Sequence, residues 1–271
     1  MLTIDENLCK KDGLCVAECP VSVITINEIS NFPEAVEGAE STCLGCGHCV
    51  AVCPHGALSH ESSPLEASPV IDKNLTIDSE HAVQFLRSRR SVRLFKDKPV
   101  EQDSVEQLIK VASYAPTGSN LQMVEWLVFS DKEKLHELSG LAIDWMRDSL
   151  KQNTKNAPPY LSRLIEAWEA GHDTVLRNAP VVILAMVNKD ARNGLVDSTI
   201  ALSYLDLVAP TFGLGSCWAG LLQGAMLNWP PVKEAMGITD DYPFHYPMMI
   251  GFNKSRYYRM PERKNPRIIW R

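Results

Sequence analysis

Four cysteines in the N-terminal part of the chain constrain this sequence more than any other feature. Their spacing is C-x2-C-x2-C-x3-C with a proline directly behind, and the residues are Cys43, Cys46, Cys49, Cys53 and Pro54. Thiolates at this spacing are typical of a 4Fe–4S cluster, with the fourth cysteine ligating a second cluster. Zinc sites instead use two pairs of ligands separated by a dozen or more residues. The run therefore favours iron–sulfur over zinc chemistry.

A second copy of this pattern begins at Cys9. Residues 9–24 (CKKDGLCVAECPVSVI) align with residues 43–58 (CLGCGHCVAVCPHGAL), and the identical pairs include Cys9/Cys43, Gly13/Gly47, Cys15/Cys49, Cys19/Cys53 and Pro20/Pro54. An internal repeat of this kind indicates one supersecondary unit used twice. Residues 1–60 thus resemble the two-cluster bacterial ferredoxins. The resemblance implies two ligand sets that exchange their last cysteine: Cys43, Cys46, Cys49 and Cys19 for one cluster, and Cys9, Cys15 and Cys53 for the other.

One position breaks the repeat, because Asp12 stands where the second run has Cys46. A carboxylate can ligate iron but is a harder ligand than a thiolate. We expect either a 4Fe–4S cluster with Asp12 as a ligand or a 3Fe–4S cluster with one corner empty. The third alternative is a site that binds nothing, and the retained Cys9, Cys15 and Cys53 argue against it.

Composition and charge favour a cytoplasmic redox enzyme. No run approaches the roughly 18 unbroken apolar residues of a membrane span, and the first residues lack the apolar region of a signal peptide. Seven of the 8 cysteines lie in the two runs, which favours a reducing compartment over disulfides. Residues 1–60 contain two lysines and eight acidic residues, a formal charge of −6 that equals the charge of the whole chain. This acidity should attract a basic redox partner and repel nucleic acid.

The remainder of the chain predicts a second domain of the α+β class. Residues 61–78 are rich in Ser and Pro and predict a linker between domains at 1–60 and 79–271. Helices are expected from Asp78 or Ser79 to about residue 89, after Asp103, and over 131–151, 160–170 and 198–212. Strands are expected over 124–129, 181–187 and 246–252, too few and too far apart for a doubly wound sheet. Pro210 should kink or shorten its helix.

Four stretches of this domain carry polar or glycine-rich patterns. RRSVRLF contains Arg89, Arg90, Ser91 and Arg93, whose guanidinium groups suit phosphate oxygens. The turn APTGSNLQ at 115–122 offers small hydroxyl and amide groups for a polyhydroxy chain and a ring edge. GLGSCWAG at 213–220 lets backbone N–H groups approach a ligand closely. PERK at 261–264 adds basic groups.

These stretches resemble the FMN-dependent nitroreductase family over about residues 79–271. Together with the N-terminal domain, the chain is similar to ferredoxin–nitroreductase fusions. The resemblance implies a homodimer with two FMN sites at the subunit interface. One chain would bind the phosphate and ring side through Arg89, Arg90, Ser91 and Arg93, with Arg263 or Lys264. The turn of the other chain would contribute Pro116, Thr117, Gly118, Ser119, Asn120 and Gln122, while the backbone of Leu214, Gly215 and Ser216 would face the flavin N5.

The sequence departs from the family pattern at two positions. Met123 stands where the family often has proline, and Pro210 lies within a helix that is usually unbroken. These departures affect the expected substrate range more than the expected cofactor binding. His172 and His245 are candidate proton donors or plain structural residues, and Trp145, Trp218 and Trp229 are candidate pocket walls or core residues. The sequence contains no P-loop and no G-x-G-x-x-G motif. Phosphoryl transfer and a Rossmann nicotinamide domain are therefore unsupported.

The expected function is an FMN-dependent oxidoreductase that reduces a nitroaromatic, quinone or activated alkene with electrons relayed through its own clusters. A ferredoxin-type or other redox protein is the expected electron donor, and neither nucleic acid nor membrane is an expected partner. The alternatives are an electron-transfer module serving a protein partner, and a redox sensor built on the Asp12 site. The sequence does not identify the proton donor or a role for NAD(P)H.

Overall fold

The computed structural model describes residues 1–152, 158 and 160–271, and the chain forms two compact units. Unit 1 contains residues 1–77 with 119–121, and unit 2 contains residues 78–118 with 122–271. Residues 61–77 include two short 3₁₀ helices, η1 (Leu65–Ala67) and η2 (Lys73–Leu75). The predicted division into domains at 1–60 and 79–271 with a linker at 61–78 remains a prediction.

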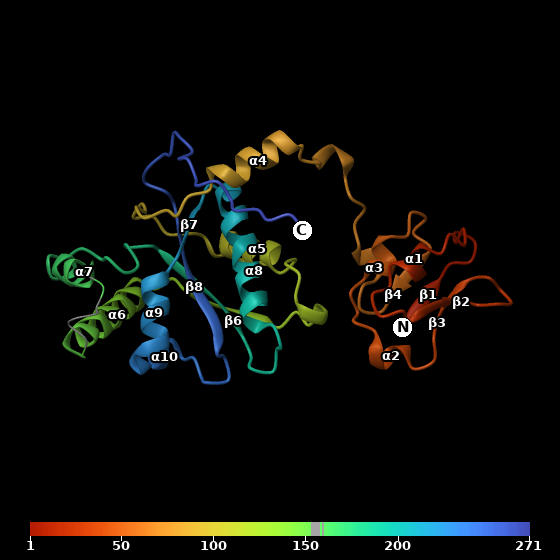
Figure 1. Ribbon diagram of the computed structural model, residues 1–271, viewed down its shortest axis with the longest axis horizontal. Coiled ribbons are helices and arrows are strands. Elements are labelled where there is room, and N and C mark those ends of the chain that lie inside the picture. The colour runs from red at the N-terminus through yellow and green to blue at the C-terminus, as the bar shows by residue number, and fades with distance from the viewer. Residues whose placement is uncertain (153–157, 159) are drawn as a thin grey trace. The chain divides into compact units, whose positions relative to one another are not determined.

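Unit 1 is built from very short elements. Two antiparallel pairs of strands join β1 (Leu2–Ile4) with β4 (Leu58–His60) and β2 (Ile24–Ile26) with β3 (Pro33–Ala35). Three helices of four residues each accompany them: α1 (Leu14–Ala17), α2 (Ala39–Thr42) and α3 (His48–Ala51) (Figure 1).

The sequence repeat is also a structural repeat. α1 and α3 begin at equivalent positions, directly after Gly13 and Gly47, whose φ angles are 74° and 70°. Only glycine adopts this left-handed conformation at little cost, so the glycine of each run fixes where its helix begins. The predicted two-fold use of one unit is confirmed.

Unit 2 contains an antiparallel sheet of four strands in the order β5-β6-β8-β7. The predicted strands are confirmed as β5 (Val124–Phe129), β6 (Val181–Val187) and β8 (Phe244–Gly251). The fourth strand, β7 (Gly215–Trp218), was missed because its four residues lie within a stretch that the sequence suggests is a glycine-rich loop. With helices around this sheet, the predicted α+β class is confirmed.

The helices of unit 2 agree with the predicted ones and add two more. They are α4 (Ser79–Ser88), α5 (Gln102–Ala112), α6 (Lys132–Gln152), α7 (Tyr160–Glu169), α8 (Gly194–Val208), α9 (Gly220–Asn228) and α10 (Pro230–Met236). Asp78 is the N-cap of α4, and its carboxylate accepts the backbone N–H of His81 at 2.9 Å. α8 changes to the 3₁₀ helix η4 (Ala209–Phe212), so Pro210 shortens the α-helix as predicted.

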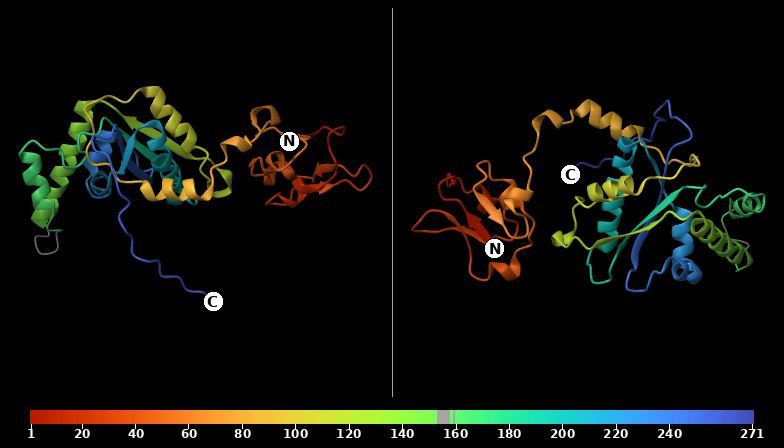
Figure 2. Two further views of the ribbon diagram at one scale, coloured as in Figure 1. Left: turned by 90° about the horizontal axis from the view of Figure 1, so that it is seen from above. Right: turned by 180° about the vertical axis from the view of Figure 1, so that it is seen from behind.

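Helices cover both faces of the central strands, which explains why β6 is apolar throughout. Val182 and Leu184 pack with α6, α7, α9 and α10, whereas Val181, Ile183 and Ala185 pack with α5 and α8. Successive side chains of a strand point to opposite faces, so the strand fills two cores. Figures 1 and 2 show α8 beside the sheet, and Figure 2 shows the C-terminal segment leaving the fold as an extended chain.

One helical segment, Gly194–Phe212, is long and apolar enough by length and composition alone to cross a membrane. Within its 19 residues, a stretch of 18 has a mean hydropathy of 1.2. They include two buried aspartates, Asp197 and Asp206, and the segment packs against α5, β6 and β8. A core helix passes the same test.

Candidate functional site

The two cysteine sets that the repeat predicts surround two separate cavities of unit 1. One cavity is lined by Cys19, Cys43, Cys46 and Cys49, and this second-cluster site also includes His60. The other, the first-cluster site, is lined by Cys9, Asp12, Cys15 and Cys53 together with His55. The fold thus gathers each set, including the cysteine that the other run supplies.

Local structure explains how the sulfur atoms are presented. Cys15 and Cys49 lie on the equivalent helices α1 and α3, and both are at least nine-tenths buried. Three backbone N–H groups donate to sulfur: Val23 to Cys19 at 3.4 Å, Gly45 to Cys43 at 3.5 Å, and Ala57 to Cys53 at 3.4 Å. Such donors stabilise thiolates and tune the potential of a cluster.

The donor sets fit clusters better than single ions. Within residues 1–152, 158 and 160–271, no three His, Cys, Asp or Glu side chains are grouped so that they could hold one metal ion. Each set instead stands around a cavity, and a cubane presents its iron atoms at separate corners, so its thiolate ligands need not converge. Three or four soft ligands per cavity suit iron–sulfur chemistry.

Burial affects the acidity of two of the candidate ligands, Cys49 and Cys15. It raises the pKa of the Cys49 thiol to about 11, against a weaker opposing effect of the backbone N–H of Val50. Burial also raises the pKa of the Cys15 thiol. Thiolates are the metal ligands, so cluster assembly must release protons from these groups.

The irregular position, Asp12, has a neighbour that the sequence did not single out as a partner. Its Oδ1 accepts the backbone N–H of Leu14 at 3.1 Å, and its Oδ2 lies 3.7 Å from Nε2 of His55. The sequence feature that could have indicated this contact is that His55 lies only two residues after Cys53. The arrangement places a carboxylate and an imidazole side by side at the corner where the other site has Cys46.

Unit 2 contains a cavity of about 140 Å³ that gathers residues from two of the predicted stretches. Arg89 and Arg90 line it from the segment after α4, and Leu214, Gly215 and Ser216 line it from the start of β7. The other lining residues are Phe85, Ser88, Val92, Leu207, Pro210, Asn253 and Tyr257.

Close backbone packing holds these two stretches together. The Val92 N–H donates to the Ser216 carbonyl at 2.9 Å. A Cβ atom on Gly215 would lie 2.5 Å from Cγ2 of Val92, so only glycine permits this approach. The glycine of GLGS is therefore required to bring the arginine segment beside β7.

A buried carboxylate that the sequence analysis missed, Asp206 of α8, organises this cavity. Its Oδ2 accepts the indole N–H of Trp218 at 3.1 Å and lies 3.5 Å from Nη1 of Arg89, and its Oδ1 accepts the hydroxyl of Ser216. Trp218 is thus tied to the site rather than being a plain core residue. The available signal was that Asp206 is one of two acidic residues in a largely apolar helix.

Among the residues that the structure describes, the guanidinium of Arg89 includes a hydrogen-bond donor without an acceptor. Its Nη1 is buried, and in the described part of the chain it forms no hydrogen bond despite the nearby carboxylate of Asp206. A buried charged donor without an acceptor is costly. An anionic oxygen in the adjoining cavity would satisfy it, so the residues present fit the phosphate of a nucleotide-type cofactor.

The remaining predicted cofactor residues lie outside this cavity. The Ser91 carbonyl accepts the Tyr257 hydroxyl at 3.4 Å, and Arg93 is exposed. Arg263 and Lys264 are exposed on the extended C-terminal segment. Arg90, by contrast, lines the cavity, and its guanidinium donates to the carbonyls of Arg87 and Arg89.

The predicted turn is anchored at the other end of α8. Gly118 donates its N–H to Oδ1 of the buried Asp197 at 3.1 Å, and Thr117 accepts the Gln122 N–H at 3.0 Å. Pro116 precedes this anchor, and Ser119 and Asn120 have φ angles of 52° and 55°. Asp197 and Asp206 are nine residues apart, roughly 13 Å along a helix. Within unit 2, Pro116, Thr117 and Gly118 are therefore not among the residues that line the Arg89 cavity.

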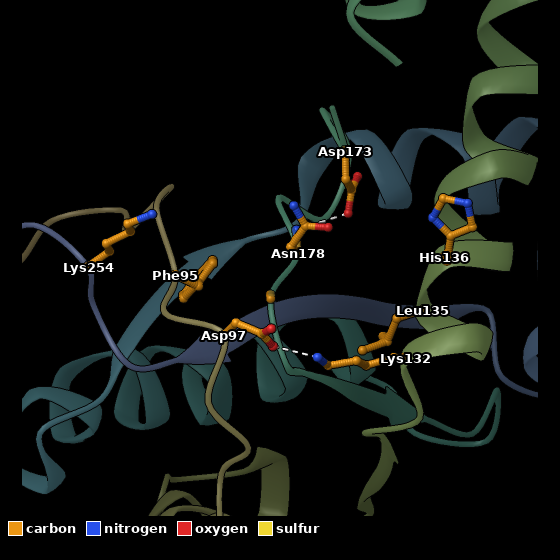
Figure 3. Close-up of a pocket in the computed structure, with 9 residues that line it drawn as sticks. Phe95, Asp97, Lys132, Leu135, His136, Asp173, Asn178 and Lys254 are labelled. Atoms are coloured by element: carbon orange, nitrogen blue, oxygen red, sulfur yellow. Dashed lines mark hydrogen bonds and ion pairs between the residues drawn. The ribbon is translucent and has the colours of Figure 1, made fainter. Parts of the chain in front are cut away.

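A larger cavity of unit 2, about 480 Å³, contains none of the predicted cofactor residues (Figure 3). Three of its charged side chains, Asp97, Lys132 and Asp173, already have partners. Lys132 donates to Asp97 at 2.5 Å, and the carboxylate of Asp173 accepts backbone N–H groups including that of Asn178. His136 stacks on Trp168. The paired charges make this cavity a weaker candidate than the Arg89 cavity.

His172 and His245 do not line the Arg89 cavity. His245 is buried on β8, where Nδ1 lies 3.2 Å from Oε1 of Gln223. Burial, aided by the charge of Lys233, lowers the pKa of His245 below its ordinary value. A proton-donor role for either histidine gains no support.

Helices on both faces of an antiparallel sheet, joined to a cysteine-rich unit, define a two-part redox protein, and the comparisons give its family. Residues 86–252 match the nitroreductase family, and residues 1–61 match a 4Fe–4S dicluster domain. The chain therefore belongs to the nitroreductase family and carries an N-terminal 4Fe–4S dicluster domain, which makes it an oxidoreductase. The predicted fusion is confirmed.

Relatives and solved structures agree with this assignment. The chain is 23% identical over 197 residues to an Archaeoglobus fulgidus protein with the provisional name NADH dehydrogenase/NAD(P)H nitroreductase, covering 71% of this chain and 98% of that protein. It is 29% identical over 150 residues to the FMN reductase (NAD(P)H) of Bacillus subtilis, covering 52% and 55%. The nitroreductase of Bacteroides fragilis with bound FMN has a similar fold, with a TM-score of 0.57 and 18% identity over 72% of this chain and all of that chain.

Proposed function

We propose that the protein is an FMN-dependent oxidoreductase that reduces a small organic acceptor with electrons relayed through its own iron–sulfur clusters. The acceptor class is a nitroaromatic, a quinone or an activated alkene. The observation that carries the proposal is the buried, unsatisfied Nη1 of Arg89 beside the close-packed backbone of Gly215 and Ser216. FMN, when bound, can accept single electrons and deliver two.

The residues of this chain would hold the flavin as follows. Arg89 and Arg90 bind the phosphate, Ser91, Arg93, Arg263 and Lys264 add donors, and the backbone of Leu214, Gly215 and Ser216 faces the ring. Asp206 keeps the Arg89 guanidinium and the Ser216 hydroxyl in place. These residues select an anionic group and leave the reacting face of the ring to the substrate.

The other half of the flavin site comes from a second copy of the chain. A cavity of about 140 Å³ is smaller than the roughly 300–1,000 Å³ of most ligand sites. Val83 and Leu86 of α4 are 50% and 54% exposed, an apolar surface that a homodimer would cover. In that dimer the turn residues Pro116, Thr117, Gly118, Ser119, Asn120 and Gln122 approach the flavin of the partner.

In unit 1, the second cluster is a 4Fe–4S cluster on Cys19, Cys43, Cys46 and Cys49. The first is a 4Fe–4S or 3Fe–4S cluster on Cys9, Cys15 and Cys53 with Asp12 at its fourth corner. The charge of −6 on residues 1–60 suits a basic redox protein as electron donor. We place the enzyme in the cytoplasm, with neither nucleic acid nor membrane as a partner.

The test is anaerobic purification with quantitation of flavin, iron and sulfide, followed by reoxidation of the reduced protein. We expect one releasable FMN and seven or eight irons per chain, and fast, saturable reoxidation by members of the acceptor panel. Finding FAD, or no flavin, would refute the cofactor assignment. Adding NADH or NADPH to the oxidised protein tests the nicotinamide as a direct donor.

A variant lacking residues 1–60 tests the relay. It should bind FMN and be reduced by small chemical reductants, but lose rapid reduction by a ferredoxin-type donor. Equal rates of reduction by that donor with and without residues 1–60 would contradict the relay.

The concentration of negative charge on residues 1–60 favours one alternative, an electron-transfer module serving a protein partner. In that case small acceptors would reoxidise the protein slowly and without saturation. A basic redox protein would instead reoxidise it rapidly, with a rate that falls as salt is added.

A further inference from the structure

His60 lies at the end of β4 with 5% of its surface exposed, and both of its ring nitrogens face a partner. Nδ1 accepts the backbone N–H of Ser62 at 3.0 Å. Nε2 lies 3.4 Å from the sulfur of Cys43. The side chain is therefore held between a peptide group and a sulfur of the second-cluster site.

These two contacts determine the tautomer of His60. A neutral imidazole carries one proton, and the nitrogen that accepts a hydrogen bond is the unprotonated one. Because Nδ1 accepts from Ser62, the proton is on Nε2 and points at the Cys43 sulfur. Cys43 also receives the N–H of Gly45 at 3.5 Å, so this sulfur has one backbone and one side-chain donor.

We propose that His60 donates an N–H···S hydrogen bond to the Cys43 thiolate and thereby raises the reduction potential of the second cluster. Reduction adds one electron and no proton to the cluster, and part of the added negative charge resides on sulfur. A fixed donor stabilises the reduced form more than the oxidised form, and hydrogen bonds to sulfur are a known determinant of cluster potential. The inference rests on the proposed ligand set, because Cys43 must bind the cluster.

The two sites differ in this respect although their backbones repeat. In the first-cluster site the nearby histidine, His55, faces the Asp12 carboxylate at 3.7 Å rather than a sulfur, and the repeat places Ile26 at the position of His60. The sulfur of Cys53 receives the backbone N–H of Ala57. The first cluster therefore serves as an internal reference, since the loss of His60 should leave its potential unchanged.

The experiment is a redox titration of the full-length holoprotein, followed by EPR, with three variants. His60→Phe keeps a ring but removes the donor, His60→Gln keeps an N–H, and His48→Phe changes an exposed histidine near the same cavity. In His60→Phe, the reduced-to-oxidised ratio of the second cluster at a fixed potential should fall about three- to tenfold, the effect of one hydrogen bond. His60→Gln should lose less, and His48→Phe should match wild type.

An unchanged second cluster in His60→Phe, or an equal change in His48→Phe, would overturn the proposal. If His60→Phe does not retain the cluster, ENDOR on reduced wild-type protein with ¹⁵N-labelled histidine decides. A ¹⁵N coupling and an exchangeable proton coupling on the second cluster are expected, and their absence overturns the inference. Iron and sulfide contents too low for two clusters would instead refute the proposed function.

Discussion

Units 1 and 2 achieve a stable fold by different means. The strands of unit 1 are three residues long, its helices have four residues, and its small core includes the cysteines Cys15 and Cys49. In unit 2 a four-stranded sheet is covered by helices on both faces, and residues such as Leu184 are fully buried. The difference indicates that unit 1 depends on its metal centres, as small domains do, whereas unit 2 depends on apolar packing.

Removing iron should have the largest effect and should act on unit 1 alone. With the clusters gone, the cysteine sets no longer hold α1, α3 and the loops together, so residues 1–60 should lose their protection against hydrogen exchange. Residues 79–152 and 160–252 should stay protected, since their cores contain no cluster ligand. Hydrogen exchange before and after anaerobic chelation measures this protection. Equal protection of unit 1 in both samples would show that its fold does not depend on the metal centres.

A core truncation should destabilise unit 2 without affecting the clusters. Leu184→Ala in β6 removes a fully buried side chain and should lower the free energy of unfolding of unit 2 by about 2–5 kcal/mol. The matched control is Leu227→Ala, because Leu227 is 63% exposed and should change the stability by less than about 0.5 kcal/mol. Urea unfolding measures both. Similar losses in the two variants would show that burial is not the cause.

Arg89→Ala tests the flavin part of unit 2. It removes a charge-assisted contact and should weaken FMN binding roughly ten- to a hundredfold, a loss of about 1.5–3 kcal/mol. Arg87→Ala is the control, because Arg87 is exposed on α4 and does not line the cavity. Flavin fluorescence during FMN titration measures the affinity. An unchanged affinity in Arg89→Ala would exclude this residue from the phosphate site.

Asp12→Cys tests the difference between the first-cluster and second-cluster sites of unit 1. The carboxylate should bind its iron less firmly than a thiolate, so mildly oxidised wild-type protein should show a 3Fe–4S EPR signal that diminishes when iron and reductant are added. The variant should retain two 4Fe–4S clusters under the same conditions. A wild-type protein that keeps both four-iron clusters would show that Asp12, or His55 beside it, is a firm ligand.

The smallest predicted effect concerns acid stability and His245 in unit 2. Burial lowers its pKa below the ordinary 6.5, so the unfolded state takes up a proton at a higher pH than the folded state. The stability of unit 2 should therefore decrease as the pH falls below about 6.5. His245→Gln should reduce the difference between the stabilities at pH 5 and pH 7.5. The same difference in wild type and variant would exclude His245 as its source.

The sequence alone determined the features that depend on residues close together in the chain. Cysteine spacing predicted two cluster sites, and the glycines of the two runs fixed where α1 and α3 begin. Runs rich in apolar residues predicted β5, β6 and β8, and the run of β6 is unbroken because that strand is buried on both faces. The stretches around Arg89 and Gly215 were recognised because donors and glycines are dense there.

Only the tertiary structure decided which distant residues meet. Asp206 joins Arg89, Ser216 and Trp218, and His60 meets Cys43, although the local sequence does not identify the partners of Asp206 or of His60. β7 was missed for the same reason, since its four residues become a strand through pairing with β8. The spacing of residues along the chain determines local geometry. By contrast, the packing of separate segments determines how far a carboxylate or an imidazole is desolvated and which group it contacts.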